Sequence, residues 1–226
     1  MAVTFRSDAS ANGTSGTSIT INKPTGAQSG DVLIAIFNIA NYTPTVADNN
    51  GSYQFTSVYA AGFTVGKYFV FKRIAGASEP STYNFTQDFS QKWSVVMLCY
   101  SGVDSSIFRI APSSSTNANG NTNAPTAPAI PSGLTADDVA IAFTAWTNAY
   151  TPTSTPSGWT VRETVTTSRT LSVVEKTVTG TSQAAAAWAY SSETYWSANM
   201  FALKPAPEIT RSRYFAAINQ QLFGGV

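Results

Sequence analysis

The sequence contains no histidine and one cysteine, and each shortage excludes a class of function. Without histidine the chain has no Ser-His-Asp triad, no Cys-His pair and no histidine ligand for a metal. Cys99 cannot form a disulfide within the chain, and its place in an apolar run predicts a small buried side chain. No glycine-rich phosphate loop precedes a predicted helix. We therefore predict a protein that is not an enzyme and has no catalytic residues, no metal and no cofactor.

Charge is also scarce, since charged residues make up 11% of the chain, with 13 Lys and Arg against 12 Asp and Glu. A nucleic-acid partner needs a basic stripe to neutralise phosphates, and the sequence has none. No apolar run reaches the roughly 18 residues that span a bilayer, and no basic segment followed by an apolar one begins the chain. We expect no nucleic acid, no membrane segment and no signal peptide. The polar surface must come from Ser, Thr, Asn and Gln, which favour strands and turns.

The sequence does contain a pattern that occurs twice. The repeated strings pair residues 30–37 with 137–143, 42–45 with 150–153, and 93–97 with 196–200. The offset stays between 103 and 108 residues, as from 93 to 196 and from 42 to 150. A nearly fixed period is the signature of a repeated structural unit. The sequence therefore predicts an internal duplication.

Both copies consist of short apolar or alternating runs bounded by Gly, Pro, Asn and Ser, which predict strands. The predicted strands cover residues 19–21, 32–37, 67–73, 81–86 and 93–100, then 139–143, 159–162, 170–178, 184–190 and 197–203. The predicted fold class is all-β, with two tandem, duplicated antiparallel β-sandwich halves of the jelly-roll-like type. The halves either form separate sandwiches or share one core, and we favour two packed halves.

Composition divides the chain into four predicted parts. Residues 1–112 form the first β-sandwich unit, and 131–206 form the second. Residues 113–130 are rich in Ser, Asn and Pro and predict a linker or surface loop between them. Residues 207–226 match nothing in the first unit and predict a C-terminal docking arm.

The arm carries the pattern of a short amphipathic helix. Thr210 or Ser212 is a suitable cap, apolar residues follow at spacings of three and four, and Gly224 and Gly225 end the segment. The apolar stripe packs either on its own sandwich or on a neighbouring subunit. The predicted partner-binding residues are Arg211, Arg213, Tyr214, Phe215, Ile218, Leu222 and Phe223.

Asp137 and Asp138 are the most obvious pair of carboxylates. Adjacent residues on a strand point to opposite faces, so the two do not easily flank one bond. Asp138 corresponds to Asp31 in the repeat, and we predict that both accept hydrogen bonds from backbone in a turn. Among the tryptophans, we expect Trp93 and Trp196 in the core. Trp146 is the best candidate for an exposed ring that stacks on a sugar, although aromatic rings more often pack inside.

Several strings resemble a β-rich type common among phage structural proteins. They are ITINKPTG at 19–26, GDVLIA at 30–35, KRIAGASEPSTY at 72–83, YSGVD at 100–104 and PSGWT at 156–160. The resemblance covers roughly residues 15 to 204. It implies a non-enzymatic virion protein that decorates or cements the capsid, bound to major capsid or tail proteins and to copies of itself. Alternatives are a protein of the tail or collar, a glycan-binding module for host recognition, and a depolymerase with two carboxylates facing one cleft.

Overall fold

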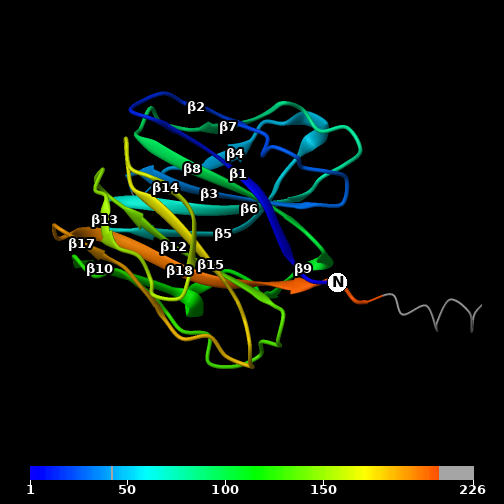
Figure 1. Ribbon diagram of the computed structural model, residues 1–226. Helices are drawn as coiled ribbons and strands as arrows, with labels where there is room; N and C mark the ends of the chain where they lie inside the picture. The colour runs from blue at the N-terminus through cyan, green and yellow to red at the C-terminus, as the bar shows by residue number, and fades with distance from the viewer. Residues whose placement is uncertain (42, 209–226) are drawn as a thin grey trace, which may run out of the picture.

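The computed structural model describes residues 1–41 and 43–208, and it is built almost entirely from strands (Figure 1). Strands make up 57% of the chain and helix 3%, so the prediction of an all-β protein is confirmed. The described part contains two single-turn 3-10 helices, η1 (Gly51–Tyr53) and η2 (Ser114–Thr116). The helix predicted in the arm lies outside the described residues.

The first large sheet has five strands, and every neighbouring pair is antiparallel. Their order is β1 (Thr4–Gly13), β8 (Trp93–Ser101), β3 (Val32–Ala40), β6 (Gly66–Ile74) and β5 (Thr56–Phe63). A small sheet of β2 (Ser18–Asn22), β7 (Thr82–Gln87) and β4 (Val46–Asp48) covers its outer face. The long apolar run of β3 is buried on both faces, as a strand between two layers must be.

The second large sheet has the same order of neighbouring strands. It consists of β10 (Asn117–Thr122), β18 (Thr194–Pro205), β12 (Val139–Trp146), β15 (Leu171–Thr177) and β14 (Thr160–Val165). Strand β9 (Val103–Ile110) pairs further along β18, beyond the end of β10. Two short pairs form the outer layer: β11 (Thr126–Ala127) with β16 (Ala186–Ala187), and β13 (Pro152–Ser154) with β17 (Ala189–Tyr190).

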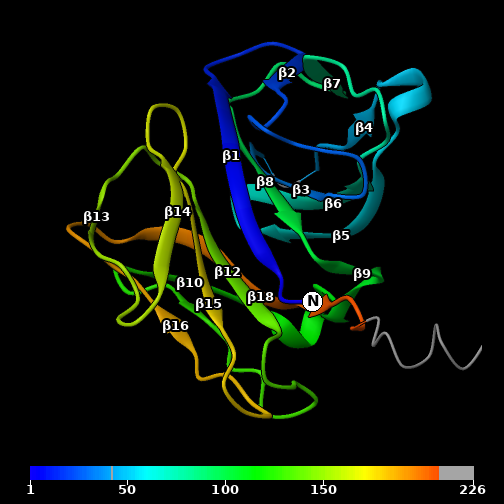
Figure 2. The same ribbon diagram turned by 45° about the vertical axis from the view of Figure 1, so that its right-hand side comes forward.

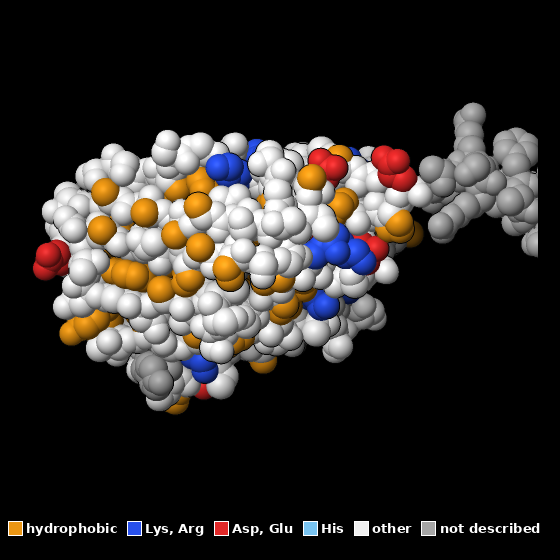
Figure 3. All heavy atoms as spheres, turned by 90° about the horizontal axis from the view of Figure 1, so that it is seen from below, with side chains coloured by type: hydrophobic (Ala, Val, Ile, Leu, Met, Phe, Trp, Pro, Cys, Tyr) orange, Lys and Arg blue, Asp and Glu red, His pale blue; other side chains and the backbone are white. Residues whose placement is uncertain are grey.

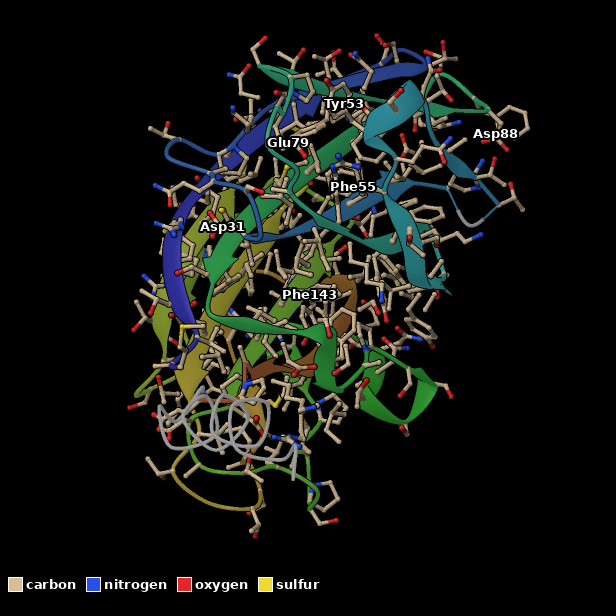
Figure 4. The ribbon with its side chains drawn as sticks, turned by 90° about the vertical axis from the view of Figure 1, so that its right-hand side faces the viewer. Asp31, Tyr53, Phe55, Glu79, Asp88 and Phe143 are labelled. Carbon is tan, nitrogen blue, oxygen red and sulfur yellow. The ribbon has the colours of Figure 1, made fainter. Side chains whose placement is uncertain are left out.

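The two large sheets face each other across one central core, which answers the question that the sequence leaves open. Ile34 and Ile36 of β3 point into this core with Ile141 and Phe143 of β12. The rings of Tyr68 and Phe143 meet edge to face with centroids 5.0 Å apart, and Figure 4 shows Phe143 in the middle of the molecule. The alternate residues of each strand fill two outer cores, one under the small sheet and one under the short pairs. The result is a sandwich-like stack of four layers.

Strand pairing differs from the predicted division of the chain between the two units. The segment 113–130 is not a linker, because it contributes η2, β10 and β11 to the second half of the molecule. Strand β9, which we placed in the first unit, also joins the second sheet. Strand β10 is polar and buries no residue fully, so a search for apolar periodicity overlooks it. Below, the first half means residues 1–101 and the second half means residues 103–205.

Candidate functional site

The predicted turn carboxylates occupy equivalent places in the two halves. An oxygen of Asp31 accepts a hydrogen bond from the backbone N–H of Gln28 at 2.8 Å, and one of Asp138 accepts from the N–H of Thr135 at 2.8 Å. Both carboxylates are buried, and each pairs with an arginine. The pairs are Arg6 with Asp31 at 2.7 Å and Arg109 with Asp138 at 3.1 Å. The predicted structural role of both residues is confirmed.

Asp137 does not share a site with Asp138. Its side chain is exposed, whereas that of Asp138 is fully buried. Asp137 lines a cavity of about 290 Å³ together with Glu208 and the N-terminal Met1. The adjacent aspartates therefore do not face one cleft.

A different pair of carboxyl groups meets where the edges of the two large sheets come together. Asp8 on β1 hydrogen-bonds to Glu163 on β14, and Ser10 donates to the same glutamate at 3.3 Å. Figure 2 shows β1 alongside β14 at this seam. Partial burial, the negative charge of Glu163 and the hydrogen bond to it raise the pKa of Asp8 to about 6. Nothing in the sequence indicates this pair, because the two residues are far apart and only the packing of the sheets brings them together.

A buried chain of polar contacts extends from this pair into the central core. Arg162 forms an ion pair with Glu175, and its guanidinium lies 4.0 Å from the ring centroid of Phe5. The hydroxyl of Tyr100 on β8 donates to Glu175 on β15 at 2.6 Å. The charge of Glu175 is thus compensated by partners from both sheets, and the cluster fixes the first half against the second.

A second cavity, of about 280 Å³, lies between the first sheet and β9. Its lining residues are Gln54, Thr56, Lys72, Arg73, Ile74, Ser105 and Ile107. Arg73 is held by Glu79 through hydrogen bonds of 2.8 to 3.2 Å, and the Lys72 ammonium lies 5.6 Å from the ring centroid of Phe108. Figure 4 shows Glu79 in the upper part of the molecule, away from Phe143. A cavity lined by cations and hydroxyls fits an anionic ligand that also carries hydroxyl groups.

The aromatic side chains are mostly internal. Trp93 and Trp196 are buried as predicted, each with 6% of its surface exposed. Trp146 is fully buried, so its ring packs inside, as aromatic rings more often do, and the alternative of an exposed ring that stacks on a sugar is wrong. Its ring packs on Tyr190 with centroids 3.7 Å apart, and its indole N–H donates to Thr144 at 2.9 Å. Trp146 is the last residue of β12, and the rings of Tyr150 and Tyr190 cover it.

One face of the molecule is almost free of charge. Residues 110–136 contain no Asp, Glu, Lys or Arg, and neither do residues 177–192. These two segments provide β10, β11, β16 and β17, which form the outer layer and the edge of the second half. Figure 3 shows the left part of this side as mostly white and orange, with charged side chains at its margins and toward the right. We call this surface the uncharged face.

The exposed side chains of the uncharged face are small or neutral. Ala185 and Ala187 point outward from the β16 region, while Ala186 and Trp188 between and after them are buried. On β10, Asn119 and Asn121 are likewise exposed and uncharged. The outer layer of the first half instead carries Lys23, Asp48 and Asp88, and Figure 4 shows Asp88 at its rim.

Cys99 lies in the outer core of the first half. It is fully buried, and burial together with the nearby Asp31 carboxylate raises the pKa of its thiol to about 12. The prediction of a small buried side chain is confirmed. No cluster of three or more potential metal ligands occurs in the described ranges. Within the same ranges, no helix has the length and apolar character needed to cross a lipid bilayer.

The partner-binding residues predicted in the arm, Arg211, Arg213, Tyr214, Phe215, Ile218, Leu222 and Phe223, lie outside the described residues. Comparison with known proteins adds no relative. No protein-family model, no curated protein and no solved structure matches the chain. The resemblance to phage structural proteins therefore stays a prediction.

Proposed function

We propose that this chain is a non-enzymatic structural protein of a phage virion, which decorates or cements the capsid. The observation that carries the proposal is the uncharged face. The centres of protein interfaces are depleted in charged residues, whereas an ordinary free surface is rich in them. A broad uncharged face, on a chain whose remaining surface carries both signs of charge, is what a subunit needs to pack against neighbouring polypeptides.

The proposal includes a duplicated sandwich as the architecture. The two large sheets have the same strand order, with β9 and β10 together in the place of β1. Gly13 lies opposite Trp93 in the first half, and Gly120 lies opposite Trp196 in the second. The Arg6–Asp31 and Arg109–Asp138 pairs also correspond. A duplicated subunit presents related surfaces twice, and many copies in a lattice multiply a modest contact through avidity.

The partners in this proposal are major capsid or tail proteins and copies of the chain itself. The uncharged face supplies the contact that the described residues support. The arm predicted from the sequence at 207–226 is proposed as a second contact. The location is the virion, either on the head or, as the alternative, on the tail or collar.

The test compares lysine substitutions on two faces of the molecule. Ala185→Lys combined with Ala187→Lys places charge on the uncharged face, and Thr20→Lys combined with Ala47→Lys is the matched control on the small sheet of the first half. All four positions are exposed, so we expect melting temperatures close to that of the wild type. Phage particles that encode each variant are purified, and the chain in them is quantified by mass spectrometry.

We expect the wild type and the control variant in the particles and a strong loss of the Ala185→Lys, Ala187→Lys variant. Separate analysis of heads and tails distinguishes decoration of the capsid from attachment to the tail or collar. Absence of the wild-type chain from particles contradicts the proposal, and so does equal incorporation of both variants.

Glycan binding is the second candidate, and the cavity that contains Lys72 favours it. A volume of about 280 Å³ lined by Lys72, two hydroxyls and an amide, with Arg73 already paired to Glu79, suits one ring of an acidic sugar. A glycan array probed with the wild-type chain and with Lys72→Ala tests this. Binding of acidic glycans that Lys72→Ala abolishes supports host recognition, and an array without hits excludes it.

A further inference from the structure

The edges of the two large sheets are protected to different degrees. The edge strands are β1 and β5 in the first sheet, and β14 and β10 in the second, where β9 continues the β10 edge. Register shifts interrupt β1 between Phe5 and Ser7, β5 between Ser57 and Tyr59, and β14 between Val161 and Glu163. Such bulges twist an edge and hinder pairing with another strand. Strand β10 pairs with β18 in regular register from Asn117 to Thr122.

The distribution of charged residues also separates β10 from β1 and β14. Strand β1 carries Arg6 and Asp8, and β14 carries Arg162 and Glu163, and these two edges also pack against each other at the seam. Strand β5 has no charged residue but has its bulge. Strand β10, with the sequence NANGNT, has no charge, no proline and no bulge. Natural proteins use those three devices to keep edges from pairing, and β10 has none of them.

The outer side of β10 is open in the described part of the chain. There β18 is the only strand that pairs with β10. Asn119, Asn121 and Thr122 are exposed, so no other segment covers that end of the strand. On the inner side, Gly120 fits against the indole of Trp196, where a Cβ atom would lie 2.5 Å from the ring. The register of β10 with β18 is regular, and pairing on one side only leaves backbone N–H and C=O groups along the free edge.

We propose that β10 pairs antiparallel with β10 of a second copy of this chain, which joins the second sheets of two molecules into one continuous sheet. This inference rests on the proposed function, since it names the surface through which copies of the chain meet. Antiparallel pairing of two identical strands has two-fold symmetry and is therefore self-complementary. No like charges face each other, because β10 has none. The uncharged faces of the two molecules then lie next to each other.

The experiment measures the mass of the chain in solution by sedimentation equilibrium from low micromolar to millimolar concentration. The variant Asn119→Lys with Asn121→Lys places lysines on the exposed side chains of β10. The matched control, Ser57→Lys with Ala60→Lys, places lysines on exposed positions of the β5 edge. Melting temperatures establish that both variants are folded.

We expect the wild type and the control to dimerise with similar affinity. The β10 variant should dimerise roughly tenfold or more weakly, because like charges then face each other across the two-fold axis. Hydrogen exchange gives a second readout that needs no substitution. The amides of residues 117–122 should become more protected as the concentration of the wild-type chain rises.

A wild type that is monomeric at every concentration overturns the proposal. So does a β10 variant that dimerises like the control, and so does a dimer whose 117–122 amides gain no protection. The virion test is independent of this one. A monomeric chain that still enters particles removes the β10 contact and leaves the proposed function standing. A chain that dimerises through β10 but is absent from particles contradicts the proposed function and leaves the β10 contact standing.

Discussion

The two halves have large sheets with the same strand order but different outer layers. In the first half the outer layer is a three-stranded sheet with charged residues at its rim. In the second half it is two short strand pairs connected by long uncharged segments. The large sheets share one strand order and face each other across the central core. The outer layers touch solvent and are free to differ, so the difference between the halves points to the outer layer as the place of function.

A close contact between a glycine and a tryptophan also occurs in both halves. A Cβ atom added at Gly13 would lie 2.6 Å from the ring of Trp93, and one added at Gly120 would lie 2.5 Å from that of Trp196. In each half a glycine on the edge strand makes room for a tryptophan at the start of the neighbouring strand. The surroundings differ in one respect, since the indole N–H of Trp196 donates to Thr122 at 3.2 Å. The N–H of Trp93 has no acceptor among the described residues.

The largest effect should come from the core that the halves share. Phe143→Ala removes a ring at the centre of this core, and we expect the free energy of unfolding to fall by about 3–5 kcal/mol. Hydrogen exchange should become faster in β3 and β8 as well as in β12 and β18. Phe37→Ala, in the outer core of the first half, is the matched control and should affect the strands of that half most. Faster exchange confined to the second sheet in Phe143→Ala would contradict a shared core.

A smaller effect should separate the two glycine–tryptophan pairs. Gly13→Ala and Gly120→Ala each force an indole to move, at a cost of about 1–3 kcal/mol in the free energy of unfolding. Gly120→Ala should cost about 1 kcal/mol more, because displacement of Trp196 also disrupts its hydrogen bond to Thr122. Urea denaturation of both variants measures the difference. Equal costs would mean that Thr122 moves with the indole and keeps its hydrogen bond. A Gly120→Ala variant as stable as the wild type would contradict the close packing of Gly120 against Trp196.

The smallest effect should appear in the pH dependence of stability at the seam between the halves. The pKa of Asp8 rises from 3.8 to about 6 on folding, so the folded chain binds this proton more tightly than the unfolded chain does. The resulting stabilisation is complete below pH 3.8 and disappears as the pH rises through about 6. Glu163 and Arg162 are the charged groups that act on Asp8, and Arg162 is itself paired with Glu175. The free energy of unfolding of the wild type should therefore fall between roughly pH 4 and pH 7.

Asp8→Asn should flatten this fall, as measured by denaturant titrations at a series of pH values. Asp88→Asn is a suitable control because hydrogen bonds, chiefly from Thr45, lower the pKa of Asp88. The contribution of Asp88 is lost at acidic pH, outside the range in which Asp8 acts. If the free energy of unfolding of Asp8→Asn falls with pH as steeply as that of the wild type, the Asp8 carboxyl does not bind the proton concerned.

Much of the fold could be predicted from the sequence, because strands that face the core have apolar periodicity. The runs at 32–37, 93–100, 139–143 and 197–203 all lie in central strands. The turn role of Asp31 and Asp138 followed from their position at a strand entrance and is confirmed. Strand β10 was missed because a polar edge strand needs only backbone pairing and leaves no apolar pattern.

The features that matter most for function were harder to predict. Trp146 follows the strand predicted at 139–143 and precedes polar residues, so its cover by Tyr190 depends on a contact between distant segments. The Asp8–Glu163 pair likewise exists only once two sheet edges meet. The Ser, Asn and Pro content of residues 113–130, within the uncharged stretch 110–136, predicted a linker. Only the fold shows that this stretch lies over one face.

The central core also determines how this sequence can change over evolutionary time. A side chain on the inner face of either large sheet must fit the opposite sheet, so substitutions there should become fixed in compensating pairs. Tyr68 with Phe143, and Tyr100 with Glu175, are the pairs in which covariation between the two halves should be strongest. Positions in the outer layers have no such counterpart, and the two ends of the stack are free to diverge independently.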